Sequence, residues 1–129
     1  MNRSFKRIAL TSSLLVLLGL VALLPLVAQS SEPREITIVA SQMVFRGASG
    51  PANPTLQVRA GERVRLVLVN EDEGFDHDLS IPGWSLATST LHGTGRTSIE
   101  FQAPNYPGKV AYLCSLHPTM MSGTIQVLQ

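Results

Sequence analysis

The sequence predicts an all-β fold, an antiparallel Greek-key β-sandwich, preceded by an N-terminal hydrophobic helix that acts as a signal or an anchor. Three observations predict it. Short segments of alternating sequence rich in β-branched residues recur between residues 35 and 128. Glycine, proline and asparagine separate these segments at the spacing that sandwiches show. Beyond the N-terminal segment, no stretch has a convincing helical periodicity.

The expected strands can be placed one by one. The clearest contains Val64, Leu66 and Leu68 on one face, with arginines on the other, and its far end is apolar on both faces, as in a central strand. A loop rich in glycine, alanine and proline at 46–54 and turns near 61–62 and 103–108 separate the segments. Strands are expected at 35–40, 55–60, 63–70, 77–81, 97–101, 109–114 and 124–128.

Residues 1–30 are interpreted as a signal peptide or an N-terminal membrane anchor. Arg3, Lys6 and Arg7 precede an uncharged apolar run at 8–28, which is typical of an export signal, and cleavage is expected after residue 30. The run is also long enough to span a bilayer, so attachment to the membrane through residues 8–28 stays open. In both cases residues 31–129 are expected to form one extracytoplasmic domain, periplasmic or at the cell surface.

The charge and the single cysteine of residues 31–129 limit the possible functions. Seven basic and nine acidic side chains give a net charge near −2, which removes the electrostatic basis for binding nucleic acid. Cys114 has no second cysteine with which to form a disulfide, and a free thiol outside the cytoplasm is prone to oxidation. A buried, inert cysteine is the plain alternative. The residues around Cys114 favour a different interpretation.

The stretch 111–127 gathers groups that bind soft metals. Cys114, His117 and two methionines lie within eight residues, between two segments that are expected to be strands. Thiolate and thioether are soft ligands and imidazole suits copper, so this mixture selects copper over hard cations. Two histidines, a cysteine and a weak axial methionine are typical of an electron-transfer copper site. His77 is the best candidate for the second histidine, because sandwich loops cluster at the two ends of the fold.

The sequence Cys-Ser-Leu-His-Pro-Thr-Met-Met-Ser-Gly-Thr-Ile at 114–125 resembles the copper loop of the cupredoxins, the plastocyanin and azurin family. The segment that ends in His77 resembles the one that carries the first histidine of that family. The resemblance covers about residues 36–128 and implies a cupredoxin-like domain that binds one copper ion. The family's ligands then fall on His77, Cys114, His117 and a methionine.

Two methionines fit the family pattern. Met121 has the azurin-like spacing to Gly123, a position where the backbone is expected to need a close approach or a special φ angle. Met120 has the shorter spacing of the amicyanin-like members, but Gly123 then lies one residue late. Met121 is therefore preferred as the axial ligand, and Met120 is expected to be apolar surface beside the site.

Residues near the expected ligands suggest further roles. Asp78 stands where many family members have asparagine or serine, and a hydrogen bond from Asp78 to the loop around Ser115, which would lower the reduction potential, is our hypothesis. His92 is expected to be solvated. The acidic run 71–78 is either a solvated loop or a docking surface for a basic redox partner. Apolar residues next to His117 are expected to surround the exposed edge of its ring.

These features together predict a copper-binding electron-transfer protein with one mononuclear type 1 site. We expect it to be a monomer that is not an enzyme and that docks with redox partners such as a cytochrome, an oxidase or a reductase. A multicopper enzyme needs more histidines and a dinuclear centre needs a second cysteine. An extracytoplasmic protein that delivers or buffers copper is the alternative, since it would use similar ligands in a more open site.

Overall fold

The computed structural model describes residues 32–48 and 50–129. The predicted signal or anchor, residues 1–30, lies outside the described residues. Within the described part, no helix is long and apolar enough to cross a membrane.

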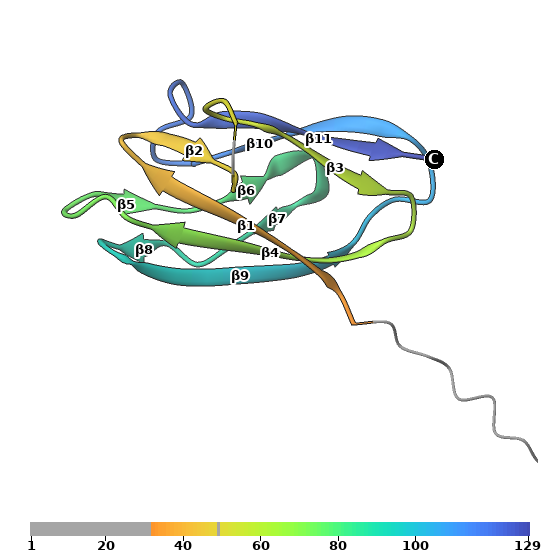
Figure 1. The fold of residues 1–129 in the computed structure, drawn as a ribbon, viewed down its shortest axis with the longest axis horizontal. Coiled ribbons are helices and arrows are strands. Elements are labelled where there is room, and N and C mark those ends of the chain that lie inside the picture. Colours follow the sequence, from red (N-terminus) through yellow and green to blue (C-terminus); the bar gives the residue numbers. More distant parts are fainter. Residues whose placement is uncertain (1–31, 49) are drawn as a thin grey trace, which may run out of the picture. The chain divides into compact units, whose positions relative to one another are not determined.

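Two β-sheets and a short ribbon make up the fold (Figure 1). One sheet has the strand order β2-β1-β4-β9, the other has the order β3-β11-β10-β6-β7, and β5 pairs with β8. A 3-10 turn, η1, lies between β6 and β7. The bounds are β1 Arg34–Ser41, β2 Val44–Arg46, β3 Thr55–Arg59, β4 Arg63–Asn70, β5 Asp76–His77, β6 Ser80–Ile81, η1 Pro82–Trp84, β7 Leu86–Ala87, β8 Leu91–His92, β9 Gly95–Gln102, β10 Gly108–Leu113 and β11 Ser122–Leu128.

The all-β sandwich is thus confirmed, but its sheets are mixed rather than purely antiparallel. β1 pairs with β4 in parallel, and β3 pairs with β11 in parallel, while the β4–β9 and β10–β11 pairs are antiparallel. Parallel neighbours need a crossover connection. Here β3, which belongs to the opposite sheet, lies in the chain between β1 and β4.

The predicted strand at 77–81 is in fact two separate pairings. β5 pairs with β8, and β6 pairs with β10 and β7, so the chain changes its partner at Asp78 and Leu79. Both of these residues are buried. This change of partner places His77 in the two-stranded ribbon rather than in either sheet.

The core lies between the two sheets and follows the alternation that the sequence predicts. The phenol ring of Tyr112 packs against Phe45, with ring centroids 5.4 Å apart, and the Tyr112 hydroxyl donates a hydrogen bond to the carbonyl of Pro54 at 2.6 Å. Aromatic side chains bury the largest areas and therefore dominate core energetics. The other core side chains with at most 1% exposure are Ile38, Ala40, Val64, Leu66, Leu68, Leu79, Ile81, Cys114, Met121 and Ile125.

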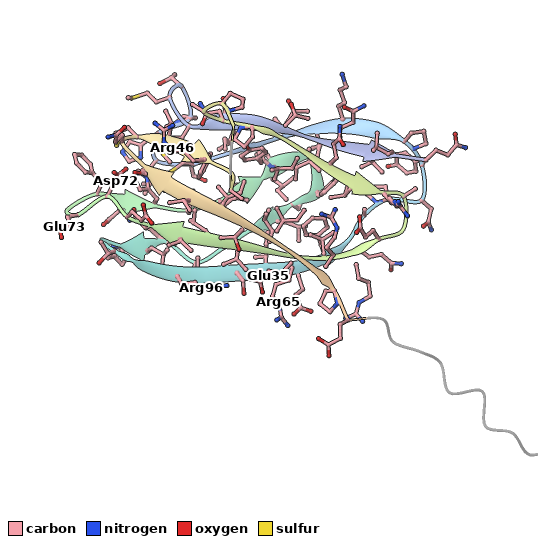
Figure 2. The ribbon with its side chains drawn as sticks, viewed as in Figure 1. Glu35, Arg46, Arg65, Asp72, Glu73 and Arg96 are labelled. Atoms are coloured by element: carbon pink, nitrogen blue, oxygen red, sulfur yellow. The ribbon has the colours of Figure 1, made fainter. Side chains whose placement is uncertain are left out.

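Charged side chains cover the outer face of the β1–β4–β9 sheet. An ion pair at 2.8 Å joins Arg96 on β9 to Glu35 on β1 (Figure 2). In register, Arg96 is opposite Val69 and Glu35 is opposite Arg65, so the pair crosses β4 at the level of Val67. This explains why Val67 is only 1% exposed although it faces outward.

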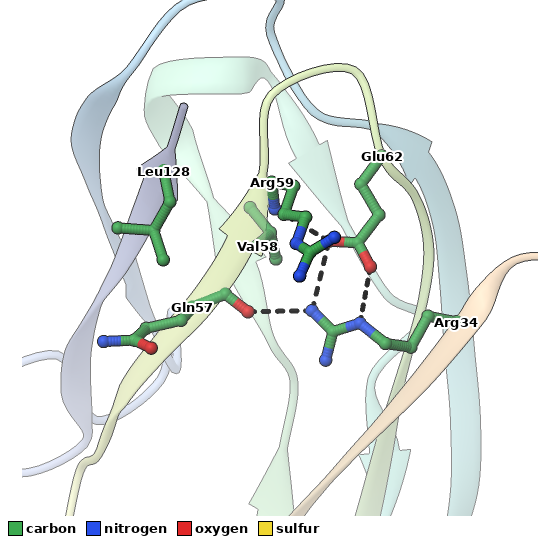
Figure 3. Close-up of a pocket in the computed structure, with 6 residues that line it drawn as sticks. All are labelled: Arg34, Gln57, Val58, Arg59, Glu62 and Leu128. Atoms are coloured by element: carbon green, nitrogen blue, oxygen red, sulfur yellow. Dashed lines mark hydrogen bonds and ion pairs between the residues drawn. The ribbon is translucent and has the colours of Figure 1, made fainter.

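A second polar contact joins the two sheets at the end that holds the β3–β4 turn. Arg34 on β1 donates from Nε to Glu62 at 2.5 Å and from Nη2 to the carbonyl of Gln57 on β3 at 2.8 Å (Figure 3). The backbone N–H of Arg59 also donates to the Glu62 carboxylate. These groups line a surface hollow of about 450 Å³. The hydrogen bond from Arg34 is the largest influence on Glu62 and holds the pKa of that carboxyl below its ordinary value.

Candidate metal centre

The loop between β10 and β11 is closed by its own backbone. Cys114 directly follows β10, and its N–H donates to the carbonyl of Met121 at 2.9 Å, which continues the hairpin by one residue. The N–H of His117 donates to the Cys114 carbonyl at 3.2 Å, and the N–H of Met121 donates to the His117 carbonyl at 2.9 Å. These successive turns bring the His117 ring back over the cysteine.

Folding brings three of the predicted ligand residues together. The Cys114 sulfur lies 3.7 Å from Nδ1 of His77 and 3.6 Å from Nδ1 of His117. The two imidazole rings have centroids 5.0 Å apart and meet edge to face at 66°. One donor atom from each of the three residues lies within 4.8 Å of the others.

This spacing fits a single metal ion. Metal–sulfur and metal–nitrogen bonds of about 2.3 and 2.1 Å allow the two donor atoms to lie up to about 4.4 Å apart. Both sulfur–nitrogen separations, 3.6 and 3.7 Å, are shorter than that limit. A thiolate with two imidazole nitrogens is also a donor set that suits copper. The residues present therefore fit the ion that the sequence motif implies.

Burial distinguishes the two methionines. Met121 is fully buried and belongs to the same core cluster as Cys114, whereas Met120 is 52% exposed. His77 and Cys114 are also fully buried, and His117 is partly buried. Met120 therefore lies at the surface, as expected. Of His77, Cys114 and His117, only His117 keeps some exposure to solvent.

Asp72 contacts the far side of the His77 ring, an interaction that the sequence motif did not reveal. Oδ2 of Asp72 lies 3.1 Å from Nε2 of His77, opposite the nitrogen that faces Cys114. Burial alone would raise the pKa of Asp72, but hydrogen bonds from the N–H groups of Met43 and Gln42 and from His77 outweigh it and lower that pKa. The carboxylate is therefore ionised at neutral pH.

The hydrogen bond that we hypothesised for Asp78 is present. The N–H of Ser115 donates to Oδ1 of Asp78 at 2.6 Å, and Asp78 is only 8% exposed. Asp78 follows His77 and Ser115 follows Cys114. The contact therefore fixes the two chain segments that carry the imidazole and the thiol relative to each other.

Asn53 is a second supporting residue that sequence reasoning missed. Its Nδ2 donates to the carbonyl of Met120 at 2.8 Å, and its Oδ1 accepts from the N–H of Phe45 at 3.0 Å. The backbone of Asn53 is left-handed, with φ 51°, a conformation that asparagine tolerates better than most residues. An Asn between Ala and Pro in a loop was a visible turn signal, but nothing local indicated its contact with the loop that follows Cys114.

The acidic run at 71–78 is largely engaged within the domain. Asp72 and Asp78 make the contacts described above, and Asp76 pairs with His92 at 2.8 Å. The His92 side chain is 80% exposed and takes no part in the cluster. Glu71 and Glu73 are exposed, and the Asp76 side chain is 47% exposed within its pair with His92. Of the five acidic side chains in this run, Asp72 and Asp78 are thus the two that are enclosed by the domain.

The fold with this site at one end of its sheets is that of the cupredoxins. Auracyanin A, a "blue" copper protein from the green thermophilic photosynthetic bacterium Chloroflexus aurantiacus, matches with a TM-score of 0.60 at 18% identity, over 75% of this chain and 100% of auracyanin A. A rusticyanin variant matches at 0.60 and 21% identity, over 77% of this chain and 80% of its own. A chain of a heme-copper terminal oxidase dimer matches at 0.60 and 18% identity, over 78% and 68%.

At these identities the similarity establishes the fold alone. No family model matches the sequence, and neither does any curated protein. The chemistry of this chain therefore depends on its own residues.

Proposed function

We propose that this protein binds one copper ion through His77, Cys114, His117 and Met121 and carries single electrons outside the cytoplasm. The observation that carries the proposal is the buried Cys114 sulfur, 3.6 and 3.7 Å from the Nδ1 atoms of two histidines. Met121 is the preferred fourth ligand because it is fully buried in the core cluster that contains Cys114. The neighbours named for their copper, auracyanin A among them, support the choice of metal.

Copper, when bound, would supply a centre that gains and loses one electron. Hydrogen bonds within the chain hold the proposed ligands and their loop in position. Asp72 fixes the His77 ring, Asp78 fixes the loop at Ser115, and the Cys114–Met121 backbone bond closes that loop. Hydrogen bonds to metal-ligating residues and to the loops that carry them orient the ligands and tune the metal.

The surface around His117 supports transient contact with a redox partner. Leu116 and Met120 are 51% and 52% exposed, and Pro118 is also exposed. An exposed apolar patch of this kind is typical of an interaction site. We expect a redox protein as the partner, of cytochrome, oxidase or reductase type, and a monomeric carrier. The basic and apolar residues 1–30 support export, with membrane attachment through residues 8–28 as an option.

Optical and EPR spectra after addition of Cu(II) test the proposal. Residues 31–129 contain every described strand and suffice for the experiment. We expect intense visible absorption from thiolate-to-Cu(II) charge transfer and reversible one-electron reduction, both lost in Cys114→Ser. Copper binding without that absorption would contradict the assignment of Cys114.

A copper-delivery protein would behave differently in the same experiment. It would hold Cu(I), stay colourless and pass the ion readily to a chelator. The full burial of Cys114, His77 and Met121 favours the carrier, because three of the four proposed ligands have no contact with solvent. Fast loss of Cu(I) to a chelator that competes only weakly would favour delivery instead.

A further inference from the structure

We propose that Asp72 is a positioning residue that sets the tautomer of His77 and shifts the site toward Cu(II). This proposal rests on the proposed copper site, because Asp72 contacts His77, one of the proposed ligands. Asp72 lies on the loop after β4, close to the end where β1 turns into β2, whereas Glu73 lies at the outer tip of that loop (Figure 2). The side chain of Asp72 is only 12% exposed.

The turn between β1 and β2 holds the Asp72 carboxylate in place. Ser41 pairs with Val44, so Gln42 and Met43 form a two-residue hairpin turn, and both have left-handed φ values of 56° and 61°. Such turns normally use Asn-Gly or another pair that tolerates positive φ. Here the two N–H groups donate to Asp72, from Gln42 to Oδ1 at 2.6 Å and from Met43 to Oδ2 at 3.0 Å. The carboxylate stabilises an unfavourable turn and is itself fixed by it.

The same carboxylate decides which nitrogen of His77 carries the proton. Each carboxylate oxygen accepts a backbone N–H, which favours the ionised form of Asp72. An ionised carboxylate only accepts hydrogen bonds, so Nε2 of His77 is the donor across 3.1 Å. Nδ1 is then the nitrogen with the free lone pair. It faces the Cys114 sulfur at 3.7 Å. Asp72 therefore holds the ring in the tautomer that can bind a metal beside the thiolate.

The negative charge of Asp72 would stabilise the two oxidation states of a bound copper ion to different extents. A negative charge on the far side of a ligand imidazole makes that ligand more basic. The same charge would stabilise Cu(II) more than Cu(I). The low exposure of the Asp72 side chain limits screening of this charge by solvent. The expected consequence is a lower reduction potential than the same site would have without the carboxylate.

Three variants separate these effects. Asp72→Asn can keep an acceptor oxygen against His77 without the charge, Asp72→Ala removes both, and Glu73→Gln removes one exposed charge from the neighbouring position. The first measurement is the reduction potential of each copper-loaded protein. The second is the imidazole ¹⁵N NMR spectrum of each metal-free protein, which reports the tautomer of His77.

We expect Asp72→Asn to weaken Cu(II) binding about tenfold more than Cu(I) binding, which corresponds to a rise of about 59 mV in the potential. Its His77 tautomer stays Nε2–H, whereas Asp72→Ala shows mixed tautomers. Glu73→Gln leaves both readouts near those of the parent. An unchanged potential in Asp72→Asn, or an equal shift in Glu73→Gln, would overturn the proposed role of the charge.

A uniform Nε2–H tautomer in Asp72→Ala would overturn the positioning role. If Asp72→Ala does not fold, the comparison of Asp72→Asn with Glu73→Gln still decides the role of the charge. Failure of the parent protein to bind copper would overturn the proposed function, and the metal-free NMR spectra would still test whether Asp72 sets the tautomer.

Discussion

Replacing Gly123 by alanine is expected to destabilise the metal-free domain by about 2–4 kcal/mol. Gly123 lies directly opposite Tyr112 in the β10–β11 hairpin. A Cβ at position 123 would overlap with Cζ and the hydroxyl oxygen of Tyr112 and lie 2.6 Å from its Cε1. The ring has little room to move, because it is fully buried, packs against Phe45 and bonds the Pro54 carbonyl.

The magnitude combines two costs. Overpacking a close-packed core costs about 1–3 kcal/mol. Displacing the Tyr112 ring also breaks its hydrogen bond to Pro54, which is worth about 1 kcal/mol. With a slope of about 1.5 kcal/mol per molar urea, the unfolding midpoint falls by roughly 2 M.

Urea unfolding of residues 31–129 without copper, followed by circular dichroism, measures this change. Gly108→Ala is the matched control on the same hairpin, because a Cβ at Gly108 meets nothing within 4 Å. We expect its unfolding free energy to stay within about 0.5 kcal/mol of the parent. Equal midpoints for the two alanine variants would refute the argument from the Tyr112 contact.

Three other outcomes follow from the structure. Asp78→Asn should raise the reduction potential of the copper-loaded protein and lower the free energy of unfolding by about 1 kcal/mol, since a charge-assisted hydrogen bond becomes a neutral one. A potential equal to that of the parent, measured by voltammetry, would reject this. Met121→Ala should lower the free energy of unfolding by about 2–5 kcal/mol, and Met120→Ala by less than about 0.5 kcal/mol, because only Met121 is buried. Similar losses for the two variants in urea unfolding would contradict the difference in burial. Glu62 has its pKa below the ordinary 4.5 when folded, so its pair with Arg34 stabilises the domain above that pH and is lost as pH falls through the folded pKa. Between pH 7 and pH 3 the stability gap between the parent and Glu62→Gln should therefore narrow, and a constant gap would contradict the pairing.

The strand at 63–70 shows what the sequence can predict well. Its alternation of apolar and charged residues reflects burial on one face, and β4 has the predicted bounds. The direction of its neighbours is not encoded in that alternation, which is the same for parallel and antiparallel partners. The parallel β1–β4 and β3–β11 pairs therefore emerged only from the structure.

The candidate site, like the strand, could be predicted from the sequence only in part. Cys114 and His117 lie close together in the sequence, and His77 could be chosen from only three histidines. The supporting contacts of Asp72 with the 42–43 turn and of Asn53 with the Met120 carbonyl join residues 29 to 67 positions apart. No local sequence pattern predicts such pairs, because they depend on which turns lie next to each other in the folded sandwich.

The backbone bond between Cys114 and Met121 makes the loop at 114–121 a replaceable module. Its two ends are fixed by the hairpin ladder, and its outside contacts from Asp78 and Asn53 reach backbone groups, the Ser115 N–H and the Met120 carbonyl. Side chains between those anchors can therefore be exchanged while the anchors persist. Variation in this segment can retune the chemistry of the site while the scaffold that displays it stays the same.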